Sequence, residues 1–322
     1  MASVFSRLSA MSLLLGLVAC GAPSVNNTDP TQSKGVKVVT TFLPITLFTE
    51  AVAGDCADVT ALIPANLGPH DFQATPSDLS DLSGANVLVK NGLGMEEFLD
   101  DLISSADNKD LVVIDSSTGV KTIKAAESGH HDDHHADGHH DHGHGHSHGE
   151  VNPHIWLDPI LAVQQVENIR DGLVKADPSC AEGYKKNAER YTAKLTKLNT
   201  DFTAKLKPYK GKTFVAFHDF APYFANRYSL KAEYLVDLPE MNPSPADLQR
   251  VAAQVKASGL KALLSEPQEG KRSFNALAKD LGVNIFEFNP LETGSIESAK
   301  EPGTYFEVMR SNVNNLIQAI GD

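Results

Sequence analysis

The segment AEGYKKNAERYTAKLTKLNTDFTAKL, residues 181–206, predicts an unusually long helix. Its apolar side chains recur at spacings of three, four and seven residues, as they do along one face of a helix. They are Tyr184, Tyr191, Leu195, Leu198, Phe202 and Leu206. At 1.5 Å per residue, such a helix would be roughly 39 Å long. That length would span two small domains, and Pro208 marks the expected end of the helix.

Short apolar strands alternate with helical stretches on both sides of this segment. Before it, we expect strands at Val36–Thr41, Asp58–Ile63, Asn86–Asn91 and Leu111–Asp115, with helices at Ile45–Gly54, Ser77–Ser83, Met95–Ser105 and Pro159–Ala176. After it, we expect strands at Thr213–Phe217, Lys231–Leu235, Leu260–Leu264 and Asn284–Phe288, with helices at Phe220–Tyr228, after Ser244, at Ser273–Leu281 and at Thr304–Ile320. Continuous apolar strands separated by helices are typical of parallel βαβ units. The pattern predicts an α/β fold of two (β/α) lobes with mainly parallel sheets, joined by one long helix.

The length and charge of the chain agree with this organisation. A chain of 322 residues is long enough for about two domains. We expect an N-terminal lobe over residues 35–180, a linking helix over 181–207 and a C-terminal lobe over 208–322. The net charge of −13 argues against nucleic acid and anionic lipid surfaces as partners.

The N-terminal residues predict export. Arg7 precedes an apolar run at Met11–Val18 that is too short to span a bilayer. The sequence Leu17-Val18-Ala19-Cys20 resembles a bacterial lipobox, in which the cysteine becomes the lipidated first residue; the alternative is an ordinary signal peptide with an incidental cysteine. We expect a signal peptide over residues 1–19, a lipid-anchored tether over 20–34 and a periplasmic or other extracytoplasmic location. The anchor would be the chain's only contact with the membrane.

Two further cysteines, Cys56 and Cys180, lie in the globular part of the chain. In an oxidising compartment, two cysteines are the number needed for one disulfide. We therefore predict a Cys56–Cys180 bond, with two free buried thiols as the alternative.

Ten of the 13 histidines crowd into one acidic tract. They are His130, His131, His134, His135, His139, His140, His142, His144, His146 and His148, within a loop expected over residues 129–149. Clustered imidazoles bind transition metals weakly without a fold, and as a group they raise the local metal concentration. The tract therefore predicts an auxiliary metal-binding loop that scavenges metal, senses excess metal or passes ions inward. A solvated loop without a role is the alternative.

The other three histidines, His70, His154 and His218, are far apart in the sequence. His70 follows the second expected strand, and His218 comes directly after the fifth. The carboxyl ends of parallel strands are where open α/β sheets place ligands. A single histidine of this kind is usually structural, but three at equivalent loop positions predict one metal site. The neighbouring Asp71, Asp158 and Asp219 could orient the imidazoles, although for Asp158 and Asp219 we favour helix capping.

Four ordered motifs carry a family resemblance. They are GPHDFQATPSD at Gly68–Asp78, HIWLDP at His154–Pro159, FHDFAPYFANRY at Phe217–Tyr228 and SEPQ at Ser265–Gln268. With the lipobox, they resemble the metal-binding solute-binding proteins of ABC importers. The last motif and the histidine-rich insertion are similar to the zinc branch, the ZnuA type.

The resemblance covers nearly the whole mature chain and implies both a site and a role. It implies a metal buried between two lobes and held by His70, His154 and His218. It also implies that Zn²⁺ is captured as the transported substrate and delivered to a membrane permease with its ATPase. We expect the protein to be a monomer and to have no enzymatic activity.

The fourth ligand is where the chain departs from manganese-type relatives, which carry carboxylates in the second lobe. Here that region reads Asn289-Pro290-Leu291-Glu292-Thr293-Gly294-Ser295. Water or Glu292 could complete the coordination, and we favour water. A site rich in nitrogen suits zinc better than manganese, which prefers harder oxygen ligands.

Two other functions stay open at this stage. One is a manganese- or iron-binding importer component of the same fold. The other is a zinc enzyme, because three histidines and a water also form catalytic zinc sites. The chain contains no H-E-x-x-H segment and no other motif that supplies an obvious general base.

Overall fold

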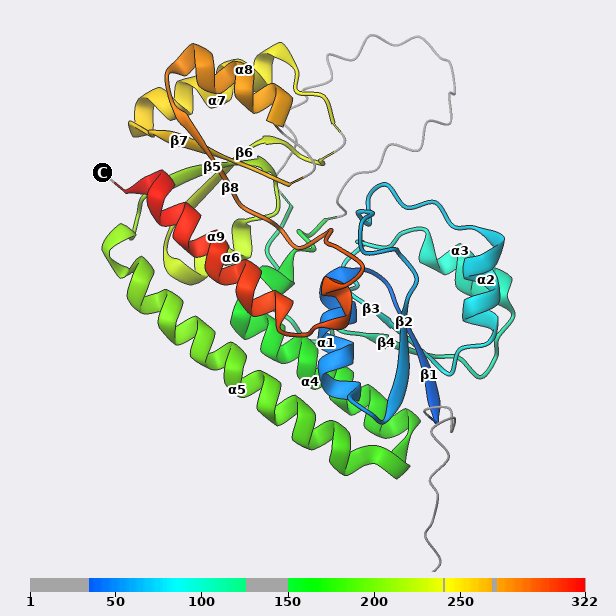
Figure 1. Ribbon diagram of the computed structural model, residues 1–322. Coiled ribbons are helices and arrows are strands. Elements are labelled where there is room, and N and C mark those ends of the chain that lie inside the picture. Colours follow the sequence, from blue (N-terminus) through cyan, green and yellow to red (C-terminus); the bar gives the residue numbers. More distant parts are fainter. Residues whose placement is uncertain (1–34, 126–149, 240, 268–270, 322) are drawn as a thin grey trace, which may run out of the picture. The chain divides into compact units, whose positions relative to one another are not determined.

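The computed structural model describes residues 35–125, 150–239, 241–267 and 271–321 (Figure 1). The expected signal peptide, lipidated cysteine and tether lie outside these residues, as does the histidine-rich tract. Among the described helices, none is long and apolar enough to cross a membrane.

Two four-stranded sheets form the frame, and every strand pairing that defines their order is parallel. The first sheet has the order β2-β1-β3-β4, from β1 (Val36–Thr40), β2 (Ala57–Ala61), β3 (Val87–Lys90) and β4 (Val112–Asp115). The second has the order β6-β5-β7-β8, from β5 (Thr213–His218), β6 (Lys231–Val236), β7 (Ala262–Ser265) and β8 (Asn284–Glu287). The fold class predicted from the sequence is confirmed, and each expected strand is present with small shifts at its ends.

Helices surround both sheets, and Figure 1 shows them on either side of each sheet. Those before the linking helix are α1 (Leu43–Ala53), α2 (Pro76–Ser83), α3 (Leu99–Ala106) and α4 (Pro159–Ala176), with the short η1 (Ile155–Leu157) and η2 (Pro178–Cys180). Those after it are η3 (Lys207–Tyr209), α6 (Pro222–Tyr228), α7 (Pro245–Ser258), α8 (Lys271–Leu281), η4 (Ser298–Lys300) and α9 (Thr304–Ile320). We call the parts built on the first and second sheets the first and second lobes.

The long helix α5 (Ala181–Leu206) has the bounds that its apolar spacing predicts. It packs against α1 and α4 from the first lobe and against α6 and α9 from the second (Figure 1). Tyr184, Tyr191, Leu195, Leu198, Phe202 and Leu206 form its buried face, together with Ala188. One hydrophobic cluster continues from Val38 in the first sheet, past this face, to Phe214 in the second. The helix is therefore part of a shared core. The exact lobe boundaries remain predictions.

The helix ends follow local sequence rules. Asp158 caps α4 by accepting a hydrogen bond from Ile160 N at 2.9 Å, and Pro159 occupies the first turn. Ser244 and Asp247 form a capping box at the start of α7. Gly259 ends that helix at φ 63°, a left-handed conformation that glycine adopts without strain.

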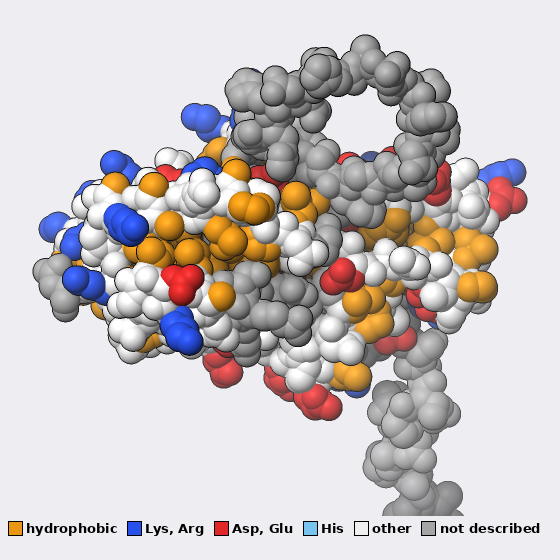
Figure 2. All heavy atoms as spheres, turned by 90° about the horizontal axis from the view of Figure 1, so that it is seen from above, with side chains coloured by type: hydrophobic (Ala, Val, Ile, Leu, Met, Phe, Trp, Pro, Cys, Tyr) orange, Lys and Arg blue, Asp and Glu red, His pale blue; other side chains and the backbone are white. Residues whose placement is uncertain are grey.

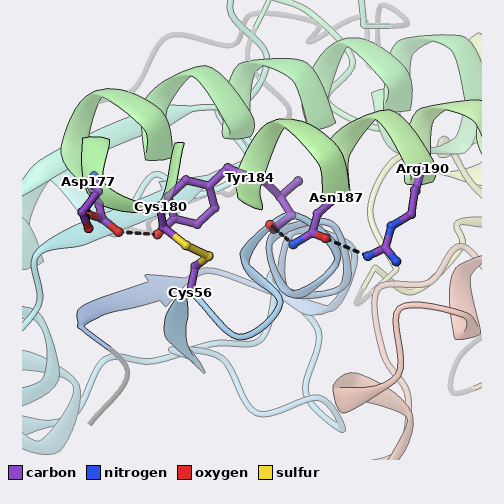
Figure 3. The surroundings of a disulfide bond; sticks show 8 residues. Cys56, Asp177, Cys180, Tyr184, Asn187 and Arg190 are labelled. Atoms are coloured by element: carbon purple, nitrogen blue, oxygen red, sulfur yellow. Dashed lines mark hydrogen bonds between the residues drawn. A yellow bond between two sulfur atoms is a disulfide. The ribbon is translucent and has the colours of Figure 1, made fainter. Parts of the chain in front are cut away.

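The predicted disulfide is present between Cys56 and Cys180 (Figure 3). It ties the residue before β2 to the N-cap of α5, with a Cα–Cα distance of 6.0 Å. Gly183 makes room for it, because a Cβ at that position would lie 2.7 Å from Cys56 Sγ. One turn further along α5, Asn187 donates a 3.0 Å hydrogen bond to the carbonyl of Val52 at the end of α1. The start of α5 is thus fastened to the first lobe at two neighbouring points.

Acidic, basic and hydrophobic side chains all lie on the face that Figure 2 shows. Large hydrophobic side chains with substantial exposure are few in the described part of the chain, namely Val112, Val113 and Ile296. The two valines belong to β4, an edge strand of the first sheet.

Candidate metal centre

Four side chains from distant parts of the sequence converge between the two sheets. They are His70, His154, His218 and Glu292, and one ligand atom from each lies within 4.8 Å of the others. Nε2 of His154 lies 3.3 Å from Nε2 of His218. Oε1 of Glu292 lies 3.1 Å from Nε2 of His154 and 3.3 Å from Nε2 of His218. The ring of His70 lies farther out, with its centroid 6.3 Å from that of His154.

Each of these residues lies at the end of a regular element or in a loop beside one, near the carboxyl ends of the strands. His218 is the last residue of β5, and His154 directly precedes η1. His70 lies in the loop between β2 and α2, and Glu292 in the loop after β8. The three histidines singled out from the sequence are therefore brought together. His154, His218 and Glu292 are buried, whereas His70 is partly exposed.

The outer nitrogens of two imidazoles are held by acceptors. Nδ1 of His218 lies 2.7 Å from Oε1 of Glu266, and Nδ1 of His154 lies 2.9 Å from Oδ1 of Asn152. The amide of Asn152 donates through Nδ2 to the carbonyl of Asp219 at 2.7 Å, which assigns Oδ1 as the acceptor. Both Nδ1 atoms must therefore donate. In the neutral rings, both Nε2 atoms then carry lone pairs that face into the site.

Two imidazole lone pairs and a carboxylate oxygen thus meet at about 3 Å in a buried place. Such a cluster of acceptors repels itself strongly at low dielectric unless a cation or protons lie between them. Imidazole nitrogen with a single carboxylate is a donor set suited to zinc, with manganese less favoured. The arrangement can bind a divalent transition metal.

The carboxylates also set the proton affinity of the site. Complete burial opposes the charged form of His218, but Glu266 and Glu292 outweigh this effect and raise its pKa well above the ordinary value. Burial likewise opposes the charge on Glu292, but the charge of His218 and hydrogen bonds from His154 and His218 hold its pKa well below the ordinary value. A metal ion entering the site must therefore displace a proton, and low pH should oppose binding.

The loop that carries Glu292 is held in an unusual conformation. Leu291 is fully buried and has φ 66°, a left-handed conformation that is rare for leucine. Its backbone N–H donates to Oδ1 of Asn289 at 2.7 Å. The first lobe holds the loop as well, because Trp156 Nε1 donates to the carbonyl of Pro290 at 2.7 Å and Gly294 N donates to the carbonyl of Ala65 at 2.6 Å. These contacts turn the Glu292 carboxylate towards the histidines, where it could serve as the fourth ligand in place of the water that we expected.

The three neighbouring aspartates have different roles. Asp158 is a helix cap, as expected, and it also pairs with Arg227 Nε at 2.8 Å. The expectation that Asp219 caps a helix is wrong, because the N-cap of α6 is Ala221. Asp219 instead accepts hydrogen bonds from the Asn152 amide through its carbonyl and its carboxylate. Asp71, next to His70 in the loop before α2, is exposed.

Sequence reasoning did not assign roles to Asn152 and Glu266, the two residues that orient the imidazoles. Both lie inside or beside the motifs already quoted. Glu266 is a charged residue directly after the apolar strand β7, and it is only 3% exposed. A carboxylate directly after an apolar strand is the sequence signal that could have identified it.

Comparison with known proteins places this geometry in a family. The family model for ZnuA, described as zinc-uptake complex component A, periplasmic, matches residues 38–319. The chain belongs to the ZnuA family. The high-affinity zinc uptake system protein ZnuA of Bacillus subtilis strain 168 is 32% identical over 301 residues, covering 93% of this chain and 92% of that protein.

Other ZnuA-family proteins are similar over most of this chain. Zinc-binding protein AdcA of Streptococcus pyogenes is 34% identical over 284 residues, covering 87% of this chain but only 55% of AdcA. The solved Zn(II)-bound ZnuA-like domain of Streptococcus pneumoniae AdcA has a TM-score of 0.73 at 30% identity, covering 89% of this chain and 99% of that domain. A crystal structure of ZnuA has a TM-score of 0.71 at 25% identity, covering 87% of this chain and 98% of that one. The likeness therefore extends over both lobes.

Proposed function

We propose that the protein is the extracytoplasmic zinc-binding component of an ABC importer, and that Zn²⁺ is its transported substrate. The observation that carries this proposal is the convergence of His70, His154, His218 and Glu292 on one buried point. Membership of the ZnuA family and similarity to zinc-binding relatives support it. Three nitrogens and one carboxylate favour zinc over the manganese or iron alternative.

The role that we propose is capture and delivery, without chemistry. The site lies between two lobes that share one core, and we propose that the loaded protein docks on a membrane permease and its ATPase as a monomer. A lipid on Cys20 would hold it at the membrane. We also propose that the first lobe ends at residue 180 and the second begins after residue 207. With this division, the long helix separates the two halves that carry the metal-binding side chains.

The histidine-rich tract is proposed as an auxiliary zinc binder or sensor. Its described flanks, Ile123–Ala125 and Glu150–Asn152, pair as a short antiparallel bridge between Lys124 and Val151. Asn152 at the end of this bridge orients His154. The tract is therefore attached close to the built site, as an auxiliary binder should be.

Replacing Glu292 by glutamine tests the proposed ligand set. We expect Glu292→Gln to raise the zinc dissociation constant by at least about 10-fold, since even groups that only orient a ligand contribute about 10- to 100-fold. Chelator competition measures the zinc dissociation constant of the variant. In a separate experiment on the unmodified protein, added manganese should displace little of the bound zinc. Glu297→Gln, at an exposed position five residues later, is the control. A change of less than about threefold in Glu292→Gln would favour water as the fourth ligand.

A further inference from the structure

Asn152 is held by both lobes at once. Its Oδ1 accepts from the backbone N–H of His154 at 3.1 Å and from Nδ1 of the same residue at 2.9 Å. Its Nδ2 donates to the carbonyl and carboxylate of Asp219, directly after β5 of the second sheet. Asn152 itself is fully buried. The orientation of one metal-binding imidazole therefore depends on a residue that the second lobe holds in place.

Tyr223 holds the backbone of the same residue. Its hydroxyl donates to the carbonyl of Asn152 at 2.8 Å and accepts from the N–H of Ile123 at 3.0 Å. Ile123 in turn accepts from the N–H of Asn152 at 2.9 Å. The hydroxyl thus closes the end of the two-stranded bridge that flanks residues 126–149. Tyr223 is 2% exposed and belongs to α6, so this contact also joins the two lobes.

These contacts are arranged in series. Tyr223 and Asp219, both from the second lobe, fix the carbonyl and the side-chain amide of Asn152. Asn152 then fixes the tautomer and the direction of His154. If the lobes separate, the Asn152 amide loses the second-lobe partners that fix it, and the acceptor for His154 Nδ1 is no longer held in one orientation.

We infer that Tyr223 is a positioning residue for zinc retention, which acts through Asn152 on His154 and makes tight binding depend on contact between the lobes. This inference rests on the proposed function, because it assumes that His154 binds the transported zinc. In this arrangement, Tyr223 does not contact the metal and acts only through Asn152. Separation of the lobes at a membrane partner would then weaken the site by the same route.

The test is the zinc dissociation rate of Tyr223→Phe in the full chain. Protein loaded with one zinc per chain is mixed with excess chelator, and the rate of zinc release is recorded. We expect zinc release to be roughly threefold to 10-fold faster. This effect is smaller than the effect, about 10- to 100-fold, of removing a group that contacts a metal-binding side chain directly. The matched control is Tyr228→Phe on the same helix, where a buried tyrosine hydroxyl donates to Asn199 Oδ1 at 3.3 Å. This control should release zinc at the wild-type rate.

A double-mutant cycle separates positioning from general loosening of the fold. Tyr223 contacts the backbone carbonyl of Asn152, so Asn152→Ala keeps that hydrogen bond but removes the amide that orients His154. If Tyr223 acts through this amide, adding Tyr223→Phe to Asn152→Ala should leave the release rate unchanged. The same addition should still lower the melting temperature of the metal-free protein.

Two results would overturn the inference. One is equal release rates for Tyr223→Phe and Tyr228→Phe. The other is the same fold-increase from Tyr223→Phe in the wild-type and Asn152→Ala backgrounds. Failure of the proposed function would look different, because the unmodified protein would then lack a single slow-releasing zinc.

Discussion

Replacing His218 by alanine should weaken zinc binding by well over about 100-fold, more than the loss of a group that only orients a ligand. His218 is fully buried and brings its Nε2 within 3.3 Å of both His154 Nε2 and Glu292 Oε1. Its removal takes one donor from the site and leaves Glu266 without the imidazole that it holds. Zinc affinity measured by chelator competition checks this prediction.

His139→Ala, within the histidine-rich tract, is the matched control for His218→Ala. One imidazole among ten in the tract should be dispensable. The zinc dissociation constant of the tight site should therefore stay within about twofold of the wild-type value. The melting temperature of each metal-free variant shows whether it is folded. A folded His218→Ala protein that binds zinc as tightly as the wild type would remove His218 from the site.

Loss of the Cys56–Cys180 bond should lower the free energy of unfolding by about 4 to 5 kcal/mol, because the bond closes a long loop in the unfolded chain. The sequence separation of the two cysteines is 124 residues. Urea unfolding of Cys56→Ser/Cys180→Ser, compared with the oxidised wild type, measures the difference. Reductant should destabilise the wild type by a similar amount and leave the double variant unchanged.

Zinc affinity should respond little to the same change. Cys56 precedes β2, whereas the metal centre lies near the opposite, carboxyl ends of the strands. The bond and the metal site should therefore act independently. Equal stability of the oxidised and reduced proteins would contradict the proposed structural role of the disulfide.

Much of the fold follows from local patterns. The apolar spacing of residues 181–206 predicts α5, and its buried face consists of the expected side chains with Ala188 added. Pro159 and Ser244 mark helix starts through rules that act within one turn. Parallel pairing follows from alternation of strands and helices. These features need no knowledge of distant contacts.

The metal centre is only partly accessible to such reasoning. The histidines stand out because the chain has so few outside the tract. The orientation of His154 and His218, however, depends on contacts of Asn152 with Asp219 and of His218 with Glu266, which join separate segments. Glu292 faces the histidines because Leu291 adopts φ 66°, against its own backbone preference. Contacts with Asn289 and with the first lobe hold that conformation. A local pattern cannot predict a conformation that only distant contacts maintain.

The most direct test of the built site is a zinc titration, by chelator competition, of the mature protein with and without residues Ser128–Gly149. We predict that both proteins bind one zinc with a dissociation constant of about 1 nM or lower, roughly −12 kcal/mol. Only the weaker, additional binding should disappear with the tract. Loss of the tight site together with the tract would contradict the account, because the tract would then be the binder and the four converging side chains would be structural.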